Sequence, residues 1–284
     1  MTSYFVMISR VVCFAAVLLL LRLPGFSQDA GSRTEFFPVH RKQVKKMPKP
    51  RRLWVFFMAG QSNMAGRGQV EPQDTLSSPR IITLNASNQW IYAKEPLHYY
   101  EPNLTGLDCG MSFARTLFAD VPKKVTVAII PCAVGGSSIE QWLEDDTYRG
   151  VTLLSNFKEK VALAKQYGTI KGILWHQGES NSKPDRIPNY EEQLQMLIDT
   201  FRGITGNPKL PILIGELGSY FEPIEAQQNS DAINAIIHQV GLSDPNVRVI
   251  TTADLHPKED KVHFNSAGQR EMGRRFAEAF LGIK

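Results

Sequence analysis

Short runs of apolar residues recur along the chain, and most are rich in β-branched side chains. The runs are nearly continuous and do not alternate with polar residues. This pattern is typical of strands that are buried on both faces of a parallel sheet. We therefore predict five strands, at 53–58, 124–130, 170–175, 210–217 and 247–252.

Between these runs, apolar residues return every three or four positions, as on the buried face of an amphipathic helix. In the last such segment, Met272 and Phe276 share one face, and Gly282 stands at the end, where helices commonly stop. We predict helices at 111–119, 151–167, 190–201, 225–240 and 266–281.

The alternation of strands and helices indicates right-handed βαβ units. We predict one α/β domain over 53–284, with a doubly wound, five-stranded parallel sheet and helices on both faces, as in flavodoxin-like folds. Residues 66–108 are less regular and contain several prolines. We expect them to form an insertion that covers the sheet edge or the functional site.

The N-terminus has a different pattern from the rest of the chain. Arg10 precedes an apolar run that is shorter than the roughly 20 residues a bilayer span requires. Small residues before Gln28 complete the pattern of a secretory signal. We expect 1–27 to be a signal peptide and the protein to be secreted or periplasmic. An uncleaved anchor helix is the alternative, and Met1 and Met7 both remain possible starts.

Charge is unevenly distributed along the 284 residues. Residues 28–52 contain eight Lys or Arg and two acidic residues, whereas 53–284 contain 22 basic and 26 acidic residues. We expect 28–52 to be a flexible basic linker. The folded part has no basic stripe interleaved with aromatic residues, so we expect no nucleic acid partner. We also expect no membrane contact after signal cleavage, and the oligomeric state stays open.

Two cysteines, Cys109 and Cys132, remain after Cys13 leaves with the signal peptide. In an exported protein they could form a disulfide or stay free, and both possibilities remain open. Two cysteines and scattered histidines do not have the spacing of a metal site. We expect neither a metal nor a cofactor.

Polar residues cluster just after four of the predicted strands. Ser62 follows the first strand, the segment 132–138 follows the second, 176–179 follows the third, and 254–263 follows the fifth. In doubly wound sheets, ligands bind at the carboxyl ends of the strands. The unusual residues therefore fall where this fold would form a site.

Ser62 is a candidate nucleophile. A serine attacks when a histidine takes its proton and an acid holds that histidine. Asp260 and His263 supply both partners within four residues. That spacing lets the carboxylate meet one ring nitrogen while the other faces outward. The alternative is a turn serine, an exposed loop acid and a histidine packed ahead of the last helix.

Acyl transfer also requires donors that stabilise the developing oxyanion. The backbone N–H groups of Ser62 and of Gly135 or Gly136 are candidates, since glycine permits close backbone approach. The side-chain amide of Gln177 is another. The alternative for the two glycines is an ordinary strand-to-helix turn.

The blocks GQSNM, GGSS, HQGES and DKVHFN occur in that order. Over 53–283 they resemble the SGNH-hydrolase superfamily, and most closely its carbohydrate O-acetylesterase branch. That branch comprises carbohydrate esterase family six and the sialate O-acetylesterase-like proteins. The resemblance implies that Ser62 is the nucleophile, His263 the base and Asp260 the acid.

The same resemblance implies that Gly135 and Gln177 are the oxyanion donors. Glu179 matches a glutamate that has been assigned the acid role in some relatives, so two carboxylates compete for this role. We favour Asp260, because a short loop holds it beside His263, and expect Glu179 to support the site through hydrogen bonds.

The resemblance implies an enzyme that removes O-acetyl groups from carbohydrate, and the expected signal peptide implies that this enzyme is exported. The first substrate that we expect is acetylated xylan or a related plant polysaccharide. A sialate O-acetylesterase is the alternative. A non-catalytic carbohydrate-binding protein on a hydrolase scaffold is an alternative of another class, although the intact Ser62, Asp260 and His263 argue against it.

Four other residues have a second interpretation. Trp90, Trp142 and Trp175 could be platforms for sugar rings, but tryptophans at such positions more often belong to the core. Asp254 and His256 are a second candidate acid–histidine pair. Only one residue lies between them, and on an extended chain we do not expect the carboxylate to meet the ring. We expect a turn there.

Overall fold

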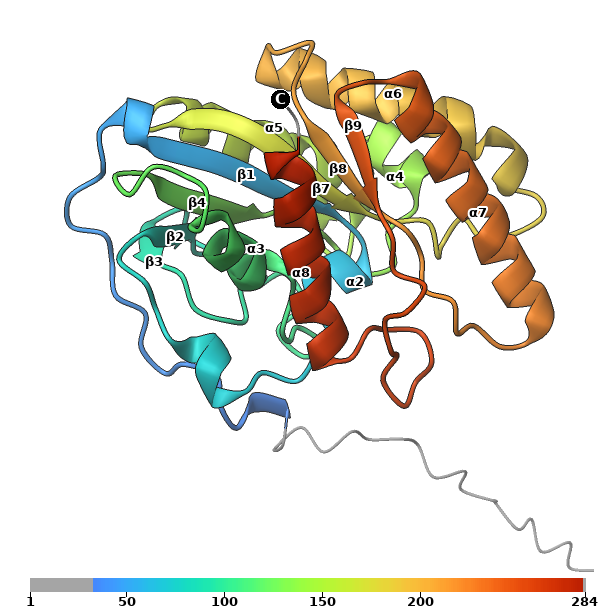
Figure 1. Ribbon diagram of the computed structural model, residues 1–284, viewed down its shortest axis with the longest axis horizontal. Coiled ribbons are helices and arrows are strands. Elements are labelled where there is room, and N and C mark those ends of the chain that lie inside the picture. The colour runs from blue at the N-terminus through green and yellow to red at the C-terminus, as the bar shows by residue number, and fades with distance from the viewer. Residues whose placement is uncertain (1–32, 283–284) are drawn as a thin grey trace, which may run out of the picture.

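The computed structural model describes residues 33–282, and its centre is a seven-stranded sheet (Figure 1). The strand order is β3-β2-β4-β1-β7-β8-β9, and every neighbouring pair is parallel except β2 and β3. The strands are β1 (Leu53–Gly60), β2 (Ile81–Leu84), β3 (Trp90–Tyr92), β4 (Thr126–Pro131), β7 (Thr169–His176), β8 (Ile212–Gly215) and β9 (Val247–Ile250). A separate hairpin joins β5 (Thr147–Tyr148) to β6 (Val151–Thr152).

The expectation of an α/β fold with a mostly parallel sheet is confirmed, but the expectation of five strands is wrong. The five apolar runs form β1, β4, β7, β8 and β9, and the segment 66–108 adds β2 and β3 at one edge. These two strands have only four and three residues, too few to show a periodic pattern. The insertion therefore extends the sheet edge.

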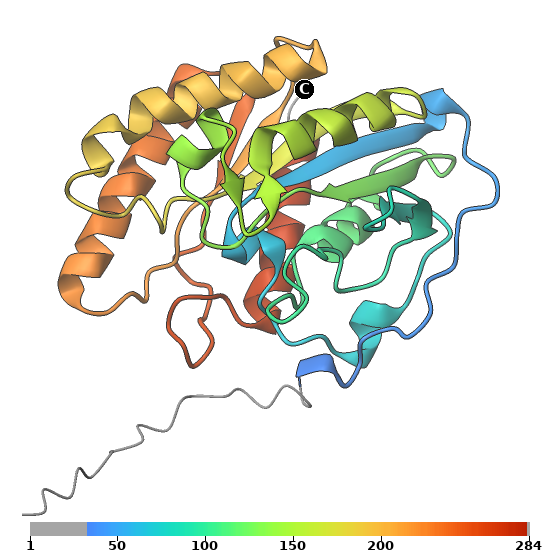
Figure 2. The ribbon, with the colours of Figure 1, turned by 180° about the vertical axis from the view of Figure 1, so that it is seen from behind.

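Helices cover both faces of the sheet. On one face lie α3 (Gly110–Leu117) and α8 (Ser266–Leu281), in front of the sheet in Figure 1. The other face packs against α4 (Ile139–Leu143), α5 (Leu153–Lys165), α6 (Ile187–Thr205) and α7 (Ile224–Ser243). Of these, α5 and α6 are nearest to the viewer in Figure 2.

The central strand β1 is buried on both sides. Val55 and Phe57 join the core under α4 to α7, whereas Phe56 and Met58 join the core under α3 and α8. All four are fully buried, and each such side chain stabilises the fold by about 1.5–3 kcal/mol. This double burial explains why the strand is continuously apolar in sequence.

Residues 33–52 pack against the domain. The expectation that 28–52 is a flexible linker is therefore wrong for 33–52. The N–H of Val44 donates to the carbonyl of Trp90 at 2.9 Å, which attaches the segment to β3. The guanidinium of Arg41 donates to the carbonyl of Pro96 at 2.6 Å. The segment therefore packs along β3 through an isolated bridge, without forming a further strand of the sheet.

The expected signal peptide, 1–27, and the first residues of the expected linker lie outside the described residues. Within 33–282, no helix has both the length and the apolar character of a membrane span. The same residues contain no group of three or more His, Cys, Asp and Glu side chains arranged to hold a metal ion.

The two cysteines are free. Cys109 and Cys132 are both fully buried and do not form a disulfide. Burial raises the pKa of Cys132 to about 12, and burial together with Asp108 raises that of Cys109 as well. Both thiols therefore stay protonated in the folded protein.

Candidate active site

The carboxyl ends of the three central strands meet at one place. Gly60, at the end of β1, pairs with His176, at the end of β7, and Met58 pairs with Pro131 of β4. The loop that follows β4 is attached here, because the N–H of Val134 donates to the Gly60 carbonyl at 3.1 Å. The segments that the sequence singled out therefore converge, as the rule for open sheets requires.

Ser62 is the first residue of a short helix, α2 (Ser62–Ala65), which begins right after β1. Gly60 makes this turn possible. Its φ is +131°, and a Cβ at this position would lie 2.1 Å from the carbonyl oxygen of His176. Only glycine fits such a contact. The chain therefore turns sharply and places Ser62 just beyond the carboxyl end of β1. The exposed fraction of Ser62 is 8%.

Ser62, His263 and Asp260 form one hydrogen-bonded chain. The Nε2 atom of His263 lies 3.0 Å from the Oγ of Ser62, and its Nδ1 lies 2.9 Å from an Oδ of Asp260. A carboxylate can only accept, so Nδ1 carries the proton and Nε2 is free to accept from the serine hydroxyl. This is the geometry that a serine nucleophile and its base require.

Asp260 stays ionised in this arrangement. Partial burial by itself would raise its pKa, but the hydrogen bonds from the His263 ring and from the backbone N–H groups of His263 and Val262 outweigh burial. Together they hold the pKa of Asp260 well below its ordinary value. The ammonium of Lys258, 3.8 Å away, adds positive charge on the same side.

Glu179 makes different contacts from those of Asp260. Its carboxylate accepts a hydrogen bond of 2.7 Å from the amide of Asn63, and it lies 3.7 Å from Nδ1 of His176. Within the described chain it makes no hydrogen bond with His263. Of the two competing carboxylates, the structure brings only Asp260 to the histidine of the serine–histidine pair.

The backbone N–H of Gly135 is occupied. It donates to the carboxylate of Glu101 at 2.6 Å, and Arg67 binds the same carboxylate at 2.8 Å. Arg149 also contacts Glu101. A Cβ on Gly135 would lie 2.0 Å from a guanidinium nitrogen of Arg67, so a side chain here would displace the Arg67–Glu101 pair. In this conformation the N–H of Gly135 is therefore engaged with Glu101 and is not free to bind an oxyanion.

The side chain of Gln177 is also engaged in this conformation. Its amide donates to Asn181 at 2.7 Å and to Gln61 at 3.3 Å, and its oxygen accepts from Tyr190 at 3.1 Å. Gln177 is fully buried and connects the loop after β7 to the residue before Ser62. Its observed role is therefore to hold the loops of the site together.

Two of the candidate oxyanion donors in the described chain are free, the backbone N–H groups of Ser62 and Gly136. Among residues 33–282, no group accepts from the N–H of Ser62 or of Gly136. The first N–H groups of a helix have no partner within the helix, which explains the free donor of Ser62. Gly136 has a φ of +80° and follows Gly135 in the loop after β4.

Comparison with known proteins identifies the family. The family model described as carbohydrate esterase, sialic acid-specific acetylesterase, matches residues 52–282. This chain belongs to that family. It is a carboxylic ester hydrolase of the carbohydrate acetylesterase type, as the resemblance of its four sequence blocks implied.

A plant protein and two solved structures are similar to this chain. The esterase is 28% identical over 249 residues to a protein of Arabidopsis thaliana named probable carbohydrate esterase. The aligned region covers 80% of this chain and 90% of the relative. The crystal structure of that plant protein matches with a TM-score of 0.70 and covers 82% of this chain and 98% of its own. The structure of NanS has the same fold, with a TM-score of 0.65, 17% identity and coverage of 83% and 98%.

Asn63 is a site residue whose role the sequence did not reveal. Its side-chain oxygen accepts from the N–H of Phe264 at 3.0 Å, its amide donates to Glu179, and its carbonyl accepts from Gln269 at 2.9 Å. Asn63 follows Ser62 and thus connects α2 to the loop that carries His263. Its place in the GQSNM block was the only available signal.

The three tryptophans considered as sugar platforms, Trp90, Trp142 and Trp175, belong to the core instead. Trp142 and Trp175 are 0% and 1% exposed and pack edge to face, and Trp90 is 8% exposed. Asp254 pairs with Arg275 at 2.6 Å rather than with His256, so the second acid–histidine pair of the sequence is not formed.

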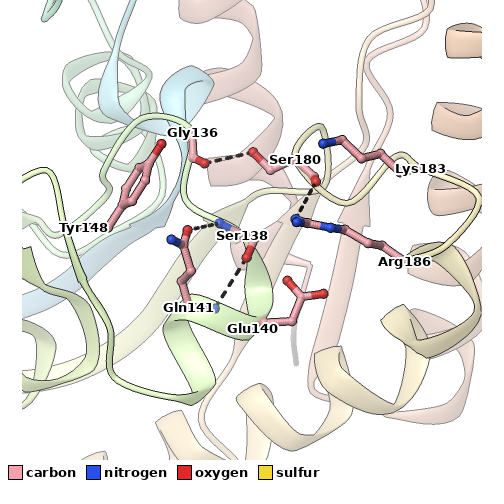
Figure 3. A pocket seen from close by; sticks show the side chains of 8 residues that line it. All are labelled: Gly136, Ser138, Glu140, Gln141, Tyr148, Ser180, Lys183 and Arg186. Atoms are coloured by element: carbon pink, nitrogen blue, oxygen red, sulfur yellow. Dashed lines mark hydrogen bonds between the residues drawn. The ribbon is translucent and has the colours of Figure 1, made fainter.

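A polar pocket of about 490 Å³ lies beside the site (Figure 3). Gly136 and Ser180 form part of its wall, and Ser180 Oγ donates to the Gly136 carbonyl at 3.0 Å. The backbone N–H of Ser180 donates to the side chain of Gln61 at 3.2 Å. The pocket is therefore attached directly to Gln61, the residue that precedes Ser62. It is lined by Gly136, Ser138, Glu140, Gln141, Tyr148, Ser180, Lys183 and Arg186.

Proposed function

We propose that this esterase removes O-acetyl groups from carbohydrate with Ser62 as its nucleophile. The observation that supports the proposal most strongly is the hydrogen-bonded chain from Asp260 through His263 to Ser62. Family membership indicates ester hydrolysis, and Ser62, His263 and Asp260 are the groups that would carry it out.

In the first half of the reaction, His263 takes the hydroxyl proton while Ser62 Oγ attacks the acetyl carbonyl. The carbonyl oxygen becomes an oxyanion, which the free N–H groups of Ser62 and Gly136 are suited to bind. The tetrahedral intermediate then breaks its bond to the sugar oxygen. His263 returns the proton to that oxygen, and the sugar alcohol leaves an acetyl-enzyme.

In the second half, a water molecule replaces the sugar. His263 takes a proton from this water, whose oxygen attacks the acetyl carbonyl, and the bond to Ser62 Oγ breaks as the serine regains its proton. Acetic acid is released, and the enzyme returns to its starting state. Asp260 stabilises the charged imidazole in both halves.

For the substrate, we propose an acetylated plant polysaccharide, with acetylated xylan first. The similarity over most of both chains to a plant protein named probable carbohydrate esterase supports a carbohydrate ester as the substrate. A sialate O-acetylesterase is the second candidate, which the description of the matching family favours. A purely carbohydrate-binding role is disfavoured, because a protein without catalytic function has no need for an intact serine–histidine–aspartate chain.

The test is acetate release by the protein comprising residues 28–284, measured beside its Ser62→Ala variant, from acetylated xylan and from an O-acetylated sialic acid. Release from xylan by the wild type alone supports the proposal. Release from the sialate alone selects the second candidate. Equal release by both proteins would rule out Ser62 as the nucleophile.

We also propose that the esterase is exported after cleavage before Gln28. The apolar run that follows Arg10 and the small residues before Gln28 support this. N-terminal sequencing of the protein recovered from the secreted or periplasmic fraction should begin at Gln28. A protein that keeps residues 1–27 and stays with the membrane fraction would overturn this proposal.

A further inference from the structure

The polar pocket beside the site contains two basic side chains without acidic partners. Lys183 has no hydrogen bond or ion pair through its ammonium within residues 33–282, and Arg186 uses one N–H to bind the carbonyl of Ser180 at 3.1 Å. In that part of the chain, no carboxylate lies within 4 Å of either group. In Figure 3 both side chains extend from the same side of the pocket toward Ser180.

The one acid in the pocket is already engaged. Both oxygens of Glu140 accept from the amide of Asn181, at 2.8 and 3.0 Å. Burial alone would raise the pKa of Glu140, but hydrogen bonds from Ser138 and Asn181 and the more distant charge of Arg186 outweigh it and lower the pKa, so the group is ionised. One negative charge faces two positive charges, and the pocket keeps a net positive charge.

The pocket has the size and the polar groups for one sugar unit. Its volume lies within the roughly 300–1,000 Å³ of typical small-ligand sites. Tyr148 and Gln141 line the side opposite Lys183 and Arg186 (Figure 3) and offer partners for sugar hydroxyls. Because Ser180 connects the pocket to Gln61, a sugar bound there would be a near neighbour of the acetyl group at Ser62.

We propose that this pocket binds the carboxylate of an acidic sugar, and that Lys183 and Arg186 make the esterase selective for acetyl groups on carbohydrates that carry one. Guanidinium and ammonium groups form strong, charge-assisted hydrogen bonds with carboxylates. The acidic sugar has two sources, a uronic acid branch on a polysaccharide or a sialic acid. The inference deepens the proposed function and depends on it.

The experiment compares substrates that differ only in the carboxylate. One pair is an acetylated xylo-oligosaccharide with a uronic acid branch and the same compound with that carboxylate as its methyl ester, and the other is an O-acetylated sialic acid and its methyl ester. For each pair, kcat/KM for acetate release is measured in the wild type, Lys183→Gln and Arg186→Gln. We expect the wild type to prefer the acidic member of one pair, which identifies the source, by about tenfold or more.

Each variant should reduce that preference by about tenfold, mainly through KM, and added salt should reduce it in the wild type. The matched control is Lys209→Gln. Lys209 is also an exposed lysine, but it precedes β8, at the opposite end of the sheet from the site. This control should keep the wild-type preference. A wild type without any preference, or variants that keep it in full, would overturn the inference.

A binding measurement separates the failure of this inference from the failure of the proposed function. Calorimetric titration of Ser62→Ala with the acidic and the neutral member of each pair reports binding without turnover. Tighter binding of an acidic member that is lost in Ser62→Ala/Lys183→Gln supports the pocket, even if neither substrate is hydrolysed by the wild type. Equal binding of acidic and neutral members would contradict it.

Discussion

At the scale of single residues, the site depends on which carboxylate reaches the histidine. Asp260 and His263 lie three positions apart, and the loop gives Asp260 two backbone N–H donors in addition to the imidazole. Glu179 receives its hydrogen bond from Asn63, on the short helix α2 that begins at Ser62. The two acids therefore hold different parts of the same site.

This difference predicts unequal effects of neutralising the two acids. Asp260→Asn removes the charge that orients and stabilises the imidazole and should lower kcat by about 10²–10⁴-fold. Glu179→Gln keeps a hydrogen-bonding group beside Asn63 and should cost about tenfold or less. Steady-state acetate release, with the melting temperature as the control for folding, compares them. The reverse ranking would assign the acid role to Glu179.

Much of this site could be predicted from sequence, because four short blocks follow four buried strands and a parallel sheet brings the ends of such strands together. The contacts made by Gly135 and Gln177 could not. Glu101, which binds Gly135, comes from the irregular segment 66–108, and no local pattern shows that this segment reaches the loop after β4. Asn63 presents a similar difficulty, since its partner Gln269 lies 206 positions away.

At the scale of elements, the short helix α2 and the loop of His263 are held together by Asn63. We expect Asn63→Ala to lower kcat by about tenfold, because the distance between Ser62 and His263 is then less well fixed. The loss of buried hydrogen bonds should also lower the melting temperature by several degrees. Kinetics and calorimetry on Asn63→Ala and Asn63→Asp test this. An unchanged kcat in both variants would show that α2 holds its position without Asn63.

The loop after β4 is held by Glu101, and this contact depends on pH. Burial would raise the pKa of Glu101, but Arg67, the N–H of Gly135 and Arg149 outweigh it and lower the pKa. A lowered pKa means that the ionised carboxylate stabilises the fold above the ordinary value of 4.5, and that this contribution disappears as the pH falls through the folded-state pKa.

The free energy of unfolding should therefore differ most between wild type and Glu101→Gln near neutral pH, and the difference should shrink in acid. Urea unfolding of both proteins at several pH values between roughly 3 and 7 measures it. Activity gives a second readout. A kcat that falls in Glu101→Gln means that the loop needs its support, whereas a kcat that rises means that Glu101 competes for an oxyanion donor.

At the scale of the whole molecule, the fold brings together side chains from the two ends of the domain. Ser62 follows the first strand and His263 precedes the last helix, 201 positions later. The insertion adds two strands to the edge next to β4, and residues 33–52 pack against β3. Nearly the whole described chain thus supports one site, without a disulfide between its two buried cysteines.

Free, buried thiols predict a simple result. A thiol reagent should modify Cys109 and Cys132 of the native protein very slowly and both of them after unfolding, because burial and a raised pKa suppress the reactive thiolate. Reducing agent should leave the melting temperature unchanged. A melting temperature that falls on reduction would indicate that the two cysteines are bonded in the native protein.

The central claim is that Ser62 is a nucleophile activated by His263. The most direct measurement is covalent labelling with an alkyl fluorophosphonate, followed by mass spectrometry of the intact protein and of its peptides. The account predicts one adduct per chain, located on Ser62, absent in Ser62→Ala and formed at least about 10³-fold more slowly in His263→Ala. An adduct on another residue, or acetate release that continues in Ser62→Ala, would contradict it.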